Sequence, residues 1–310
     1  MGRYLLRRLL QGVAVLWLLT VIVFAISRLS GNPVDLLLPE GAPPSQREAL
    51  IHSLGLDRSL PVQYGKFVGN ALQGDFGQSI RFHTSAISLV LGHMPATIEL
   101  ALAALALAVV VGIPVGILAA LYRGRFVDYV ATSTLTLGQA TPSFWLAILL
   151  ILLFGVDLGW LPIGGRSGLQ SLIMPAVTLA IVPLVVIARV TRSSIIGVLP
   201  QDYVRTAEAK GLRRLTILRR HVLRNGLIPV VTVSGIAMGE LLSGAVITEQ
   251  IFTWPGIGWL AIQAIEARDY AVVQATTLLA GAIIIGLNLL VDFLYFALDP
   301  RIREAQAATA

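Results

Sequence analysis

The sequence contains no cysteine, and only 13% of its 310 residues are charged. Without thiols the chain can form no disulfide framework, no thiolate metal site and no cysteine nucleophile. Its four histidines are scattered and show no metal-ligand spacing. The sequence also lacks the Gly-x-x-x-x-Gly-Lys-[Ser/Thr] loop that holds nucleotide phosphates and the His-Glu-x-x-His and Gly-x-Ser-x-Gly motifs of hydrolases. We therefore expect no catalytic residues, no metal site and no ATP hydrolysis in this chain by itself.

What the sequence has in abundance is apolar residues. They make up 56% of the chain, and the mean hydropathy is +0.80. A soluble domain of this size is far less apolar, so the composition indicates a polytopic membrane protein. The net charge of +6 could suggest a nucleic-acid partner. The basic residues, however, cluster in the short segments between apolar runs, which is typical of membrane orientation and argues against nucleic acid.

The apolar runs predict an all-α membrane protein with about six transmembrane helices. Each run is long enough to cross a bilayer at the helical rise of about 1.5 Å per residue. The third is expected to bend at Pro142, and Gly112 and Gly116 in the second have a spacing that allows close helix packing. The predicted spans cover residues 9–27, 100–122, 129–156, 168–188, 227–247 and 272–298.

These spans divide the chain into four parts. Residues 1–28 hold an N-terminal segment and the first span, and residues 29–95 are predicted to be a small extracytoplasmic helical insertion. Within the insertion, Ser45 begins a capping box and Pro61 can start a second helix. The insertion is too small to bury much core, so we expect it to pack on the membrane part and on a partner. The transmembrane core covers residues 96–303, with a cytoplasmic loop at 190–226, and residues 304–310 form a tail.

Lysine and arginine set the expected orientation. If the N-terminus lies inside, the short loops on that side carry many basic residues and the short outer loops carry few, as the positive-inside rule requires. We therefore predict that both termini are cytoplasmic. The basic residues that support this orientation are Arg3, Arg7, Arg8, Arg123, Arg125, Arg301, Arg303 and those between 189 and 224.

The segment 200–229 is the most basic part of the chain and cannot lie in hydrocarbon. Asp202 is expected to cap a short helix that Gly211 ends in the left-handed conformation. A second helix should follow, with an apolar stripe formed by Leu215, Leu218 and Val222. Two short helices at an angle could enter the groove of a partner or lie on anionic lipid headgroups. The pattern alone leaves both alternatives open.

Glu240 is the one carboxylate placed deep in a predicted span. It lies roughly 18 Å beyond the cytoplasmic start of that span at helical rise. A carboxylate at that depth costs about 2.5 kcal/mol or more unless it is neutralised or faces a water-filled cavity. It could line a translocation pathway and favour a cationic substrate or an amino terminus. Alternatively, a protonated Glu240 could form a hydrogen bond between helices.

Several motifs together resemble one known family. Residues 203–211 read Tyr-Val-Arg-Thr-Ala-Glu-Ala-Lys-Gly, and Arg220-His-Val-Leu-Arg-Asn225 and Ile228-Pro229 follow. This run is similar to the coupling loop of the inner-membrane subunits of ABC importers, in the branch that carries dipeptides, oligopeptides, glutathione and nickel. The resemblance extends over nearly the whole chain. Its further signatures are Leu54-Gly-Leu-Asp57, Gly74-Asp-Phe-Gly77, Pro95-Ala-Thr-Ile-Glu-Leu100, Thr191-Arg-Ser-Ser194, Trp254-Pro-Gly-Ile-Gly258, Arg268-Asp-Tyr270 and Asp299-Pro-Arg-Ile-Arg303.

The resemblance implies a non-enzymatic permease of the cell inner membrane. It would pair with a second homologous permease, receive substrate from an extracytoplasmic binding protein, and dock two ATP-binding subunits that hold the ATP and Mg²⁺. No cofactor is expected in this chain. Glu208 departs from the branch, whose members commonly carry arginine there. The residues expected to contact the ATP-binding subunits are Tyr203, Arg205, Thr206, Ala207, Glu208, Ala209, Lys210 and Gly211.

Short peptides are the substrate class that the resemblance favours. The same architecture could import nickel, a metal chelate or glutathione. An ion-coupled secondary transporter is the alternative from another class, although the spans lack the chains of acids and histidines that proton-coupled carriers use.

Overall fold

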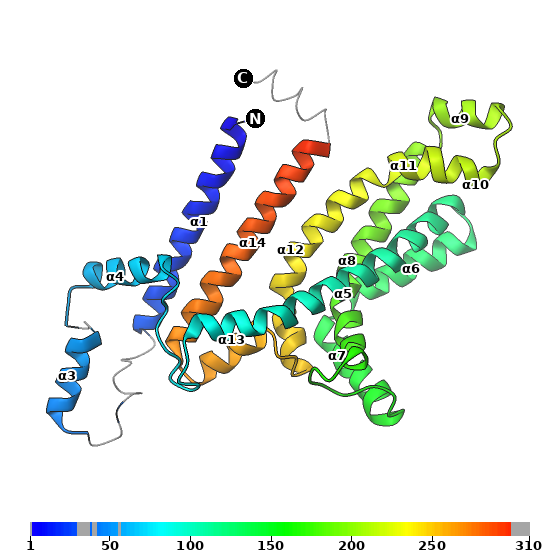
Figure 1. The fold of residues 1–310 in the computed structure, drawn as a ribbon. Coiled ribbons are helices and arrows are strands. Elements are labelled where there is room, and N and C mark those ends of the chain that lie inside the picture. The colour runs from blue at the N-terminus through cyan, green and yellow to red at the C-terminus, as the bar shows by residue number, and fades with distance from the viewer. Residues whose placement is uncertain (1, 30–37, 39–41, 55–56, 299–310) are drawn as a thin grey trace. The chain divides into compact units, whose positions relative to one another are not determined.

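The computed structural model describes residues 2–29, 38, 42–54 and 57–298. These residues form helices, with one isolated antiparallel bridge between Gln78 and Ser85 (Figure 1). The predicted all-α class is therefore confirmed. The chain divides into two compact units, one made of Met1–Pro95 and Gly256–Leu289 and the other of Ala96–Pro255 and Leu290–Ala310.

The first unit contains the N-terminal helices and the helices that follow residue 255. Its core joins Ala86 and Val90 to Leu260, Val272 and Ala275, all of which are buried. Its helices are α1 (Gly2–Leu29), α3 (Pro44–Leu54), α4 (Leu60–Leu72), the start of α5 (Ala86–Leu121), α13 (Ile257–Glu266) and most of α14 (Tyr270–Leu298).

Helix α4 packs on α1, as expected of an insertion too small to hold its own core. The Tyr64 hydroxyl shares a hydrogen bond of 2.8 Å with Thr20 Oγ1. Phe24 meets the rings of Tyr64 and Phe67 at centroid distances of 5.4 and 5.8 Å. The predicted start at Pro61 is confirmed, since Pro61 lies in the first turn of α4.

The other helix predicted in the insertion is α3, and its start differs slightly from the prediction. Helix α3 begins at Pro44, so Ser45 lies inside its first turn instead of capping it. Proline at the start of a helix has a fixed φ suited to that position and loses no hydrogen bond there, which explains the earlier start.

The second unit is built around α8 (Leu169–Val198), which contacts α6, α7, α11 and α12. It also holds the remainder of α5. Its other elements are α6 (Phe126–Ala140), α7 (Ser143–Leu150), the π-helical turn η1 (Ile151–Asp157), α9 (Asp202–Ala209), α10 (Arg214–Ile217), the π-helical turn η2 (Leu218–Val222), α11 (Leu223–Gly226) and α12 (Ile228–Ile251).

The second unit includes two bent helix pairs. The chain turns by 99° between α6 and the α7–η1 segment, at Thr141 and Pro142, so the predicted bend at Pro142 is confirmed. The α10–α11 segment meets α12 at 50°. By length and composition, four described helices can cross a membrane, and six can if each bent pair counts as one span. The prediction of about six spans matches the upper number.

Two helices are longer than the predicted spans. Helix α5 begins at Ala86 instead of residue 100, and α8 continues to Val198 although the predicted span ends at residue 188. The extensions contain Glu99, Arg189 and Arg192. Charged residues end a membrane span, but glutamate and arginine are good helix formers, so they do not end the helix. The basic loop is therefore entered through a continuous helix.

Gly112 and Gly116 lie where α5 crosses α8. A Cβ atom added at Gly112 would meet the Leu184 carbonyl oxygen at 3.0 Å, and one at Gly116 would meet the Ala188 carbonyl oxygen at 2.5 Å. The predicted close packing at this glycine pair is confirmed.

Candidate functional site

The basic loop between α8 and α12 folds into two short helical arms (Figure 1). The first arm is α9, which buries Val204 and Ala207 and exposes its other residues. The second arm is the segment α10–η2–α11. The side chains of Val204 and Ala207 pack in one small core with Ile195 of α8 and with Ile217 and Val222 of the second arm. The apolar face of α9 thus packs against the neighbouring helices, while its polar face is exposed.

The residues predicted to contact the ATP-binding subunits lie on both faces of the loop. Ala207 is 3% exposed and belongs to the core. The remaining seven are exposed, and they are Tyr203, Arg205, Thr206, Glu208, Ala209, Lys210 and Gly211. The structure therefore brings seven predicted contact residues to one accessible region and makes Ala207 an anchor beneath them.

The prediction is confirmed at the C-terminal end of α9 and is wrong at its N-terminal end. Gly211 has a φ of +74°, so the predicted left-handed turn after the helix is confirmed. At the other end the predicted cap is wrong: Gln201 is the N-cap residue, and no side chain caps the helix. Asp202 is already in the first turn because the extended backbone occurs one residue earlier, with a ψ of 147° at Gln201. Its carboxylate still favours the positive end of the helix dipole.

The second arm runs through α10, η2 and α11 and contains a π-helical turn that the sequence pattern did not predict. A π turn pairs residues five apart instead of four. Ile217 and Val222, five apart, are therefore the buried pair, at 5% and 1% exposure. Of the predicted stripe, Val222 and Leu218 do pack in the small core. Leu215 is 58% exposed, so its place in the stripe is wrong.

A hydrogen bond links the two arms. Asn225 Nδ2 donates to the Tyr203 hydroxyl at 3.0 Å and to the His221 carbonyl oxygen at 3.3 Å. Because Asn225 belongs to α11 and Tyr203 to α9, this contact fixes the end of one arm to the start of the other.

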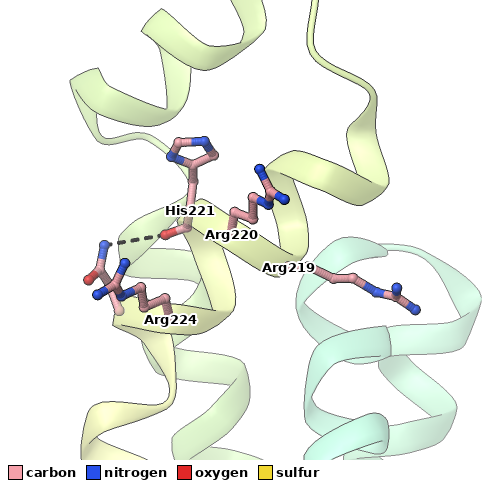
Figure 2. A pocket seen from close by; sticks show the side chains of 5 residues that line it. Arg219, Arg220, His221 and Arg224 are labelled. Atoms are coloured by element: carbon pink, nitrogen blue, oxygen red, sulfur yellow. Dashed lines mark hydrogen bonds between the residues drawn. The ribbon is translucent and has the colours of Figure 1, made fainter.

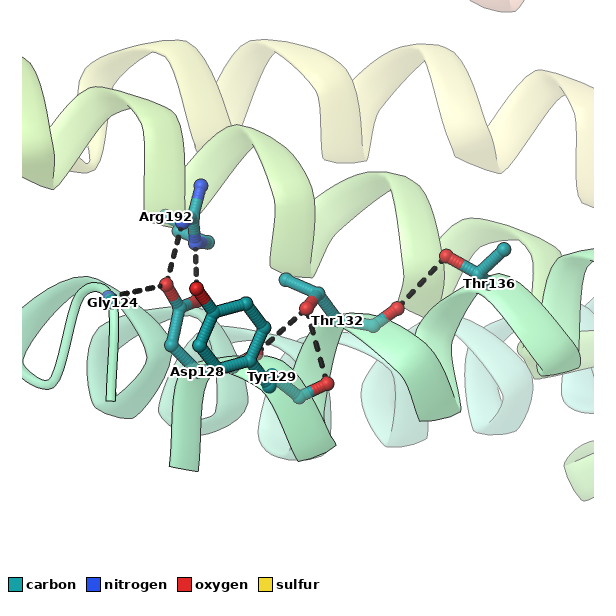
Figure 3. Close-up of polar contacts among 6 residues, drawn as sticks. All are labelled: Gly124, Asp128, Tyr129, Thr132, Thr136 and Arg192. Carbon is teal, nitrogen blue, oxygen red and sulfur yellow. Dashed lines mark hydrogen bonds and ion pairs between the residues drawn. The ribbon is translucent and has the colours of Figure 1, made fainter. Parts of the chain in front are cut away.

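Beneath the loop, Arg192 of α8 binds Asp128 of α6 (Figure 3). Arg192 Nε donates to Asp128 Oδ1 at 2.7 Å, and Nη2 donates to Oδ2 at 2.8 Å. The Gly124 amide donates to the same Oδ2 at 2.9 Å, and Asp128 is only 5% exposed. Such bidentate charge-assisted pairs have a fixed geometry, so α6 and α8 are joined close to the start of the loop. Sequence reasoning missed this pair, although Asp128 lies only three residues after the basic turn at residues 123–125.

Glu240 lies on the exposed side of α12. Among the described residues, no hydrogen-bond donor or cation contacts its carboxylate. The two roles predicted for Glu240 both depend on what covers this side of α12, so they stay predictions.

A second acid on α12, missed by sequence reasoning, is fully buried. Glu249 is 0% exposed, and Thr97 Oγ1 of α5 donates to its Oε1 at 2.6 Å. Next to it, Trp254 Nε1 donates to the Ala96 carbonyl oxygen at 2.8 Å. These contacts tie the end of α12 to α5. The available signal was the polar pair Thr248 and Glu249 at the end of an apolar run.

The described residues contain no group of three or more His, Asp or Glu side chains that could hold a metal ion. The loop presents exposed basic and polar groups on a buried apolar support.

Comparison with known proteins gives one consistent result. The sequence pattern described as "Binding-protein-dependent transport system inner membrane component" matches residues 112–304, and that of the N-terminal part of these membrane components matches residues 1–101. The chain is 41% identical to a di/tripeptide transport system permease protein of Pseudomonas aeruginosa, over 97% of this chain and 98% of that protein. It is 38% identical to an oligopeptide transport system permease protein of Bacillus subtilis, over 97% and 99% of the two chains.

Solved structures agree on the fold. A chain of the inward-facing MetNI methionine ABC transporter superposes with a TM-score of 0.57 at 18% identity and covers 68% of this chain and 96% of its own. A chain of an amino acid ABC transporter crystallised with histidines superposes with a TM-score of 0.54 at 16% identity, over 67% and 92%. At these identities the likeness shows a shared fold.

Proposed function

The chain belongs to the family of binding-protein-dependent transport system inner membrane components, and from this premise we propose that it imports short peptides as the permease subunit of an ATP-driven transporter. The observation that carries the proposal is the end-to-end similarity to permeases named for di/tripeptide and oligopeptide transport. Nickel, glutathione and an ion-coupled carrier have no comparable support.

The proposed partners are those of an ABC importer. Two ATP-binding subunits are proposed to hold ATP and Mg²⁺, since this chain has no phosphate-binding loop of its own. The exposed face of α9, with Tyr203, Arg205 and Glu208, is the surface proposed to dock one of them. A second homologous permease completes the pathway, and an extracytoplasmic binding protein delivers the peptide.

The contacts around the loop suggest how movement passes into the membrane. Ala207 fixes α9 to the apolar core, Asn225 fixes it to α11, and the Asp128–Arg192 pair joins α8 to α6. A displacement of α9 is therefore shared by several membrane helices at once. A two-state rearrangement of packed helices can convert a displacement of α9 into opening of the pathway on the outer face of the membrane.

The family and the apolar helices make this a multi-pass protein of the inner membrane. Within it, we propose that both termini and the α9–α11 loop face the cytoplasm, because the short basic segments then lie inside. Glu240 is proposed to face the pathway and to favour the amino terminus of a peptide, since a carboxylate in a span is tolerated where it meets water or a cation.

Uptake by the reconstituted transporter tests the proposal. The chain, its second permease, the ATP-binding subunits and the binding protein are placed in vesicles with ATP inside, and labelled dipeptide is added outside. We expect accumulation that requires ATP and the binding protein. Uptake driven by an ion gradient alone would refute the importer, and a binding protein that takes nickel chelates or glutathione but no peptide would refute the substrate class.

A further inference from the structure

The second arm of the loop carries a basic hollow that the proposed docking face does not use. Its volume is about 890 Å³, and η2 and α11 line it with Arg219, Arg220, His221, Arg224 and Asn225 (Figure 2). We call it the arginine hollow. Figure 2 shows the four labelled side chains spreading outward from a single helical segment.

The three arginines of the hollow have no carboxylate partner among the described residues. Two other arginines of this chain bind a carboxylate: Arg192 binds Asp128 at 2.7 Å, and Arg166 binds Glu99 at 2.6 Å. Within the part of the chain that the structure describes, no carboxylate lies within ion-pair distance of Arg219, Arg220 or Arg224. Three like charges on one short helical segment repel one another, so a bound anion would stabilise the segment.

The surroundings of the hollow fit an amphiphilic anion. Arg224 lies near the end of α11, and Ile228, four residues later, is the first residue of α12. Ile228 and Val231 are 49% and 58% exposed on the first turn of the apolar helix α12. A cationic group beside an apolar helix surface is the arrangement that places a phosphate at the membrane surface and an acyl chain along the helix.

From these observations we propose that the arginine hollow binds the phosphate of an anionic phospholipid in the cytoplasmic leaflet, with an acyl chain along Ile228 and Val231. Arginine suits this role because its planar guanidinium donates two parallel hydrogen bonds to phosphate oxygens. Asn225 strengthens the site indirectly, since its bond to Tyr203 keeps α11 fixed against α9.

The proposal rests on the cytoplasmic orientation proposed above and not on the identity of the substrate. The bound lipid would secure the second arm at the membrane surface while α9, on the other arm, stays accessible to an ATP-binding subunit. The alternative occupant of the hollow is an acidic surface of that subunit, and the experiment separates the two.

Native mass spectrometry of the purified complex tests the proposal. The complex is titrated in detergent with phosphatidylglycerol and, separately, with phosphatidylcholine. A hollow variant carries Arg219→Gln, Arg220→Gln and Arg224→Gln. A control variant carries Arg125→Gln, Arg213→Gln and Arg214→Gln, which removes the same charge from exposed positions outside the hollow. Gel filtration establishes that both variants fold, and co-purification records whether the ATP-binding subunits stay bound.

We expect the wild-type complex to retain phosphatidylglycerol selectively. The hollow variant should bind it about a hundredfold more weakly, because each arginine near a membrane surface strengthens anionic-lipid binding severalfold. The control variant should retain wild-type binding. Equal losses in the two variants, or no loss in either, would overturn the proposal. Displacement of the lipid by inorganic phosphate would assign the hollow to a free anion. Release of the ATP-binding subunits with unchanged lipid binding would assign it to that subunit, and either result would overturn the lipid proposal.

Discussion

Replacing Gly116 with alanine should separate α5 from α8. A Cβ atom at this position would lie 2.5 Å from the Ala188 carbonyl oxygen and 2.6 Å from Thr191 Cβ. Ala188 and Thr191 are both 0% exposed. The carbonyl oxygen belongs to the backbone of α8 and cannot turn aside, so the two helices must move apart.

The size of the effect follows from two opposing terms. Overpacking a tight contact costs about 1–3 kcal/mol. Alanine gains up to about 1 kcal/mol over glycine in helix propensity. With the full gain of about 1 kcal/mol subtracted, we expect Gly116→Ala to lower the free energy of unfolding by about 0–2 kcal/mol. At Gly112 the nearest atoms would be 3.0 and 3.1 Å away. A small shift relieves that contact, so Gly112→Ala should be close to neutral.

Gly197 is the matched control. It lies on α8 itself, and a Cβ atom there would meet nothing within 4 Å. Gly197→Ala should leave stability unchanged or raise it. The three variants are compared by the temperature at which the purified chain loses its monodisperse gel-filtration peak in detergent. The expected order of that temperature is Gly197→Ala above Gly112→Ala, with Gly116→Ala lowest. If Gly116→Ala equals or exceeds Gly112→Ala, the close approach of the two helices at Gly116 is refuted.

Three further predictions concern single polar contacts. Asp128→Asn should destabilise the chain by about 1.5–3 kcal/mol, because a bidentate bond to a charged guanidinium is lost; the gel-filtration assay measures this, and equal stability of the variant would show that the pair contributes nothing. Tyr203→Phe removes the acceptor for Asn225 and should cost about 0.5–1.5 kcal/mol. Faster amide hydrogen exchange in α9, with no change in α6, is the expected signature, and unchanged exchange in α9 would contradict the link. Thr97→Val should cost about 0.5–1.5 kcal/mol because its hydrogen bond to Glu249 is lost. Glu249→Gln should cost less, since the amide oxygen still accepts the bond, and the reverse order would be inconsistent with the observed contact.

Local signals predicted much of the fold. The apolar runs indicated about six spans, Pro142 marked the bend, Pro61 marked the start of α4, and Gly211 marked the turn after α9. Each of these features depends on residues adjacent in the chain. The glycine pair at Gly112 and Gly116 predicted close packing as well, but the spacing could not name α8 as the helix that contacts it.

The long-range contacts that hold the loop and α12 in place could not be predicted from local signals. Asp128 and Arg192 are 64 residues apart, and Thr97 and Glu249 are 152 apart. Only the packed arrangement of α5, α6, α8 and α12 brings them together. The π turn at Leu218–Val222 was missed for a different reason. The α-helical spacing placed Leu215 on the buried stripe and left Ile217 out of it, whereas the structure exposes Leu215 and buries Ile217.

Helix α8 has an uneven stiffness along its length. Its two internal prolines, Pro175 and Pro183, lack the amide hydrogens that would bond to the carbonyls of Ser171 and Leu179. The stretch from Leu184 to Val198 contains no proline. Bending of α8 is therefore concentrated in its first half, while the half that enters the loop behaves as a rod about 22 Å long. A rotation of about 10° at Pro183 would displace the far end of that rod by about 4 Å.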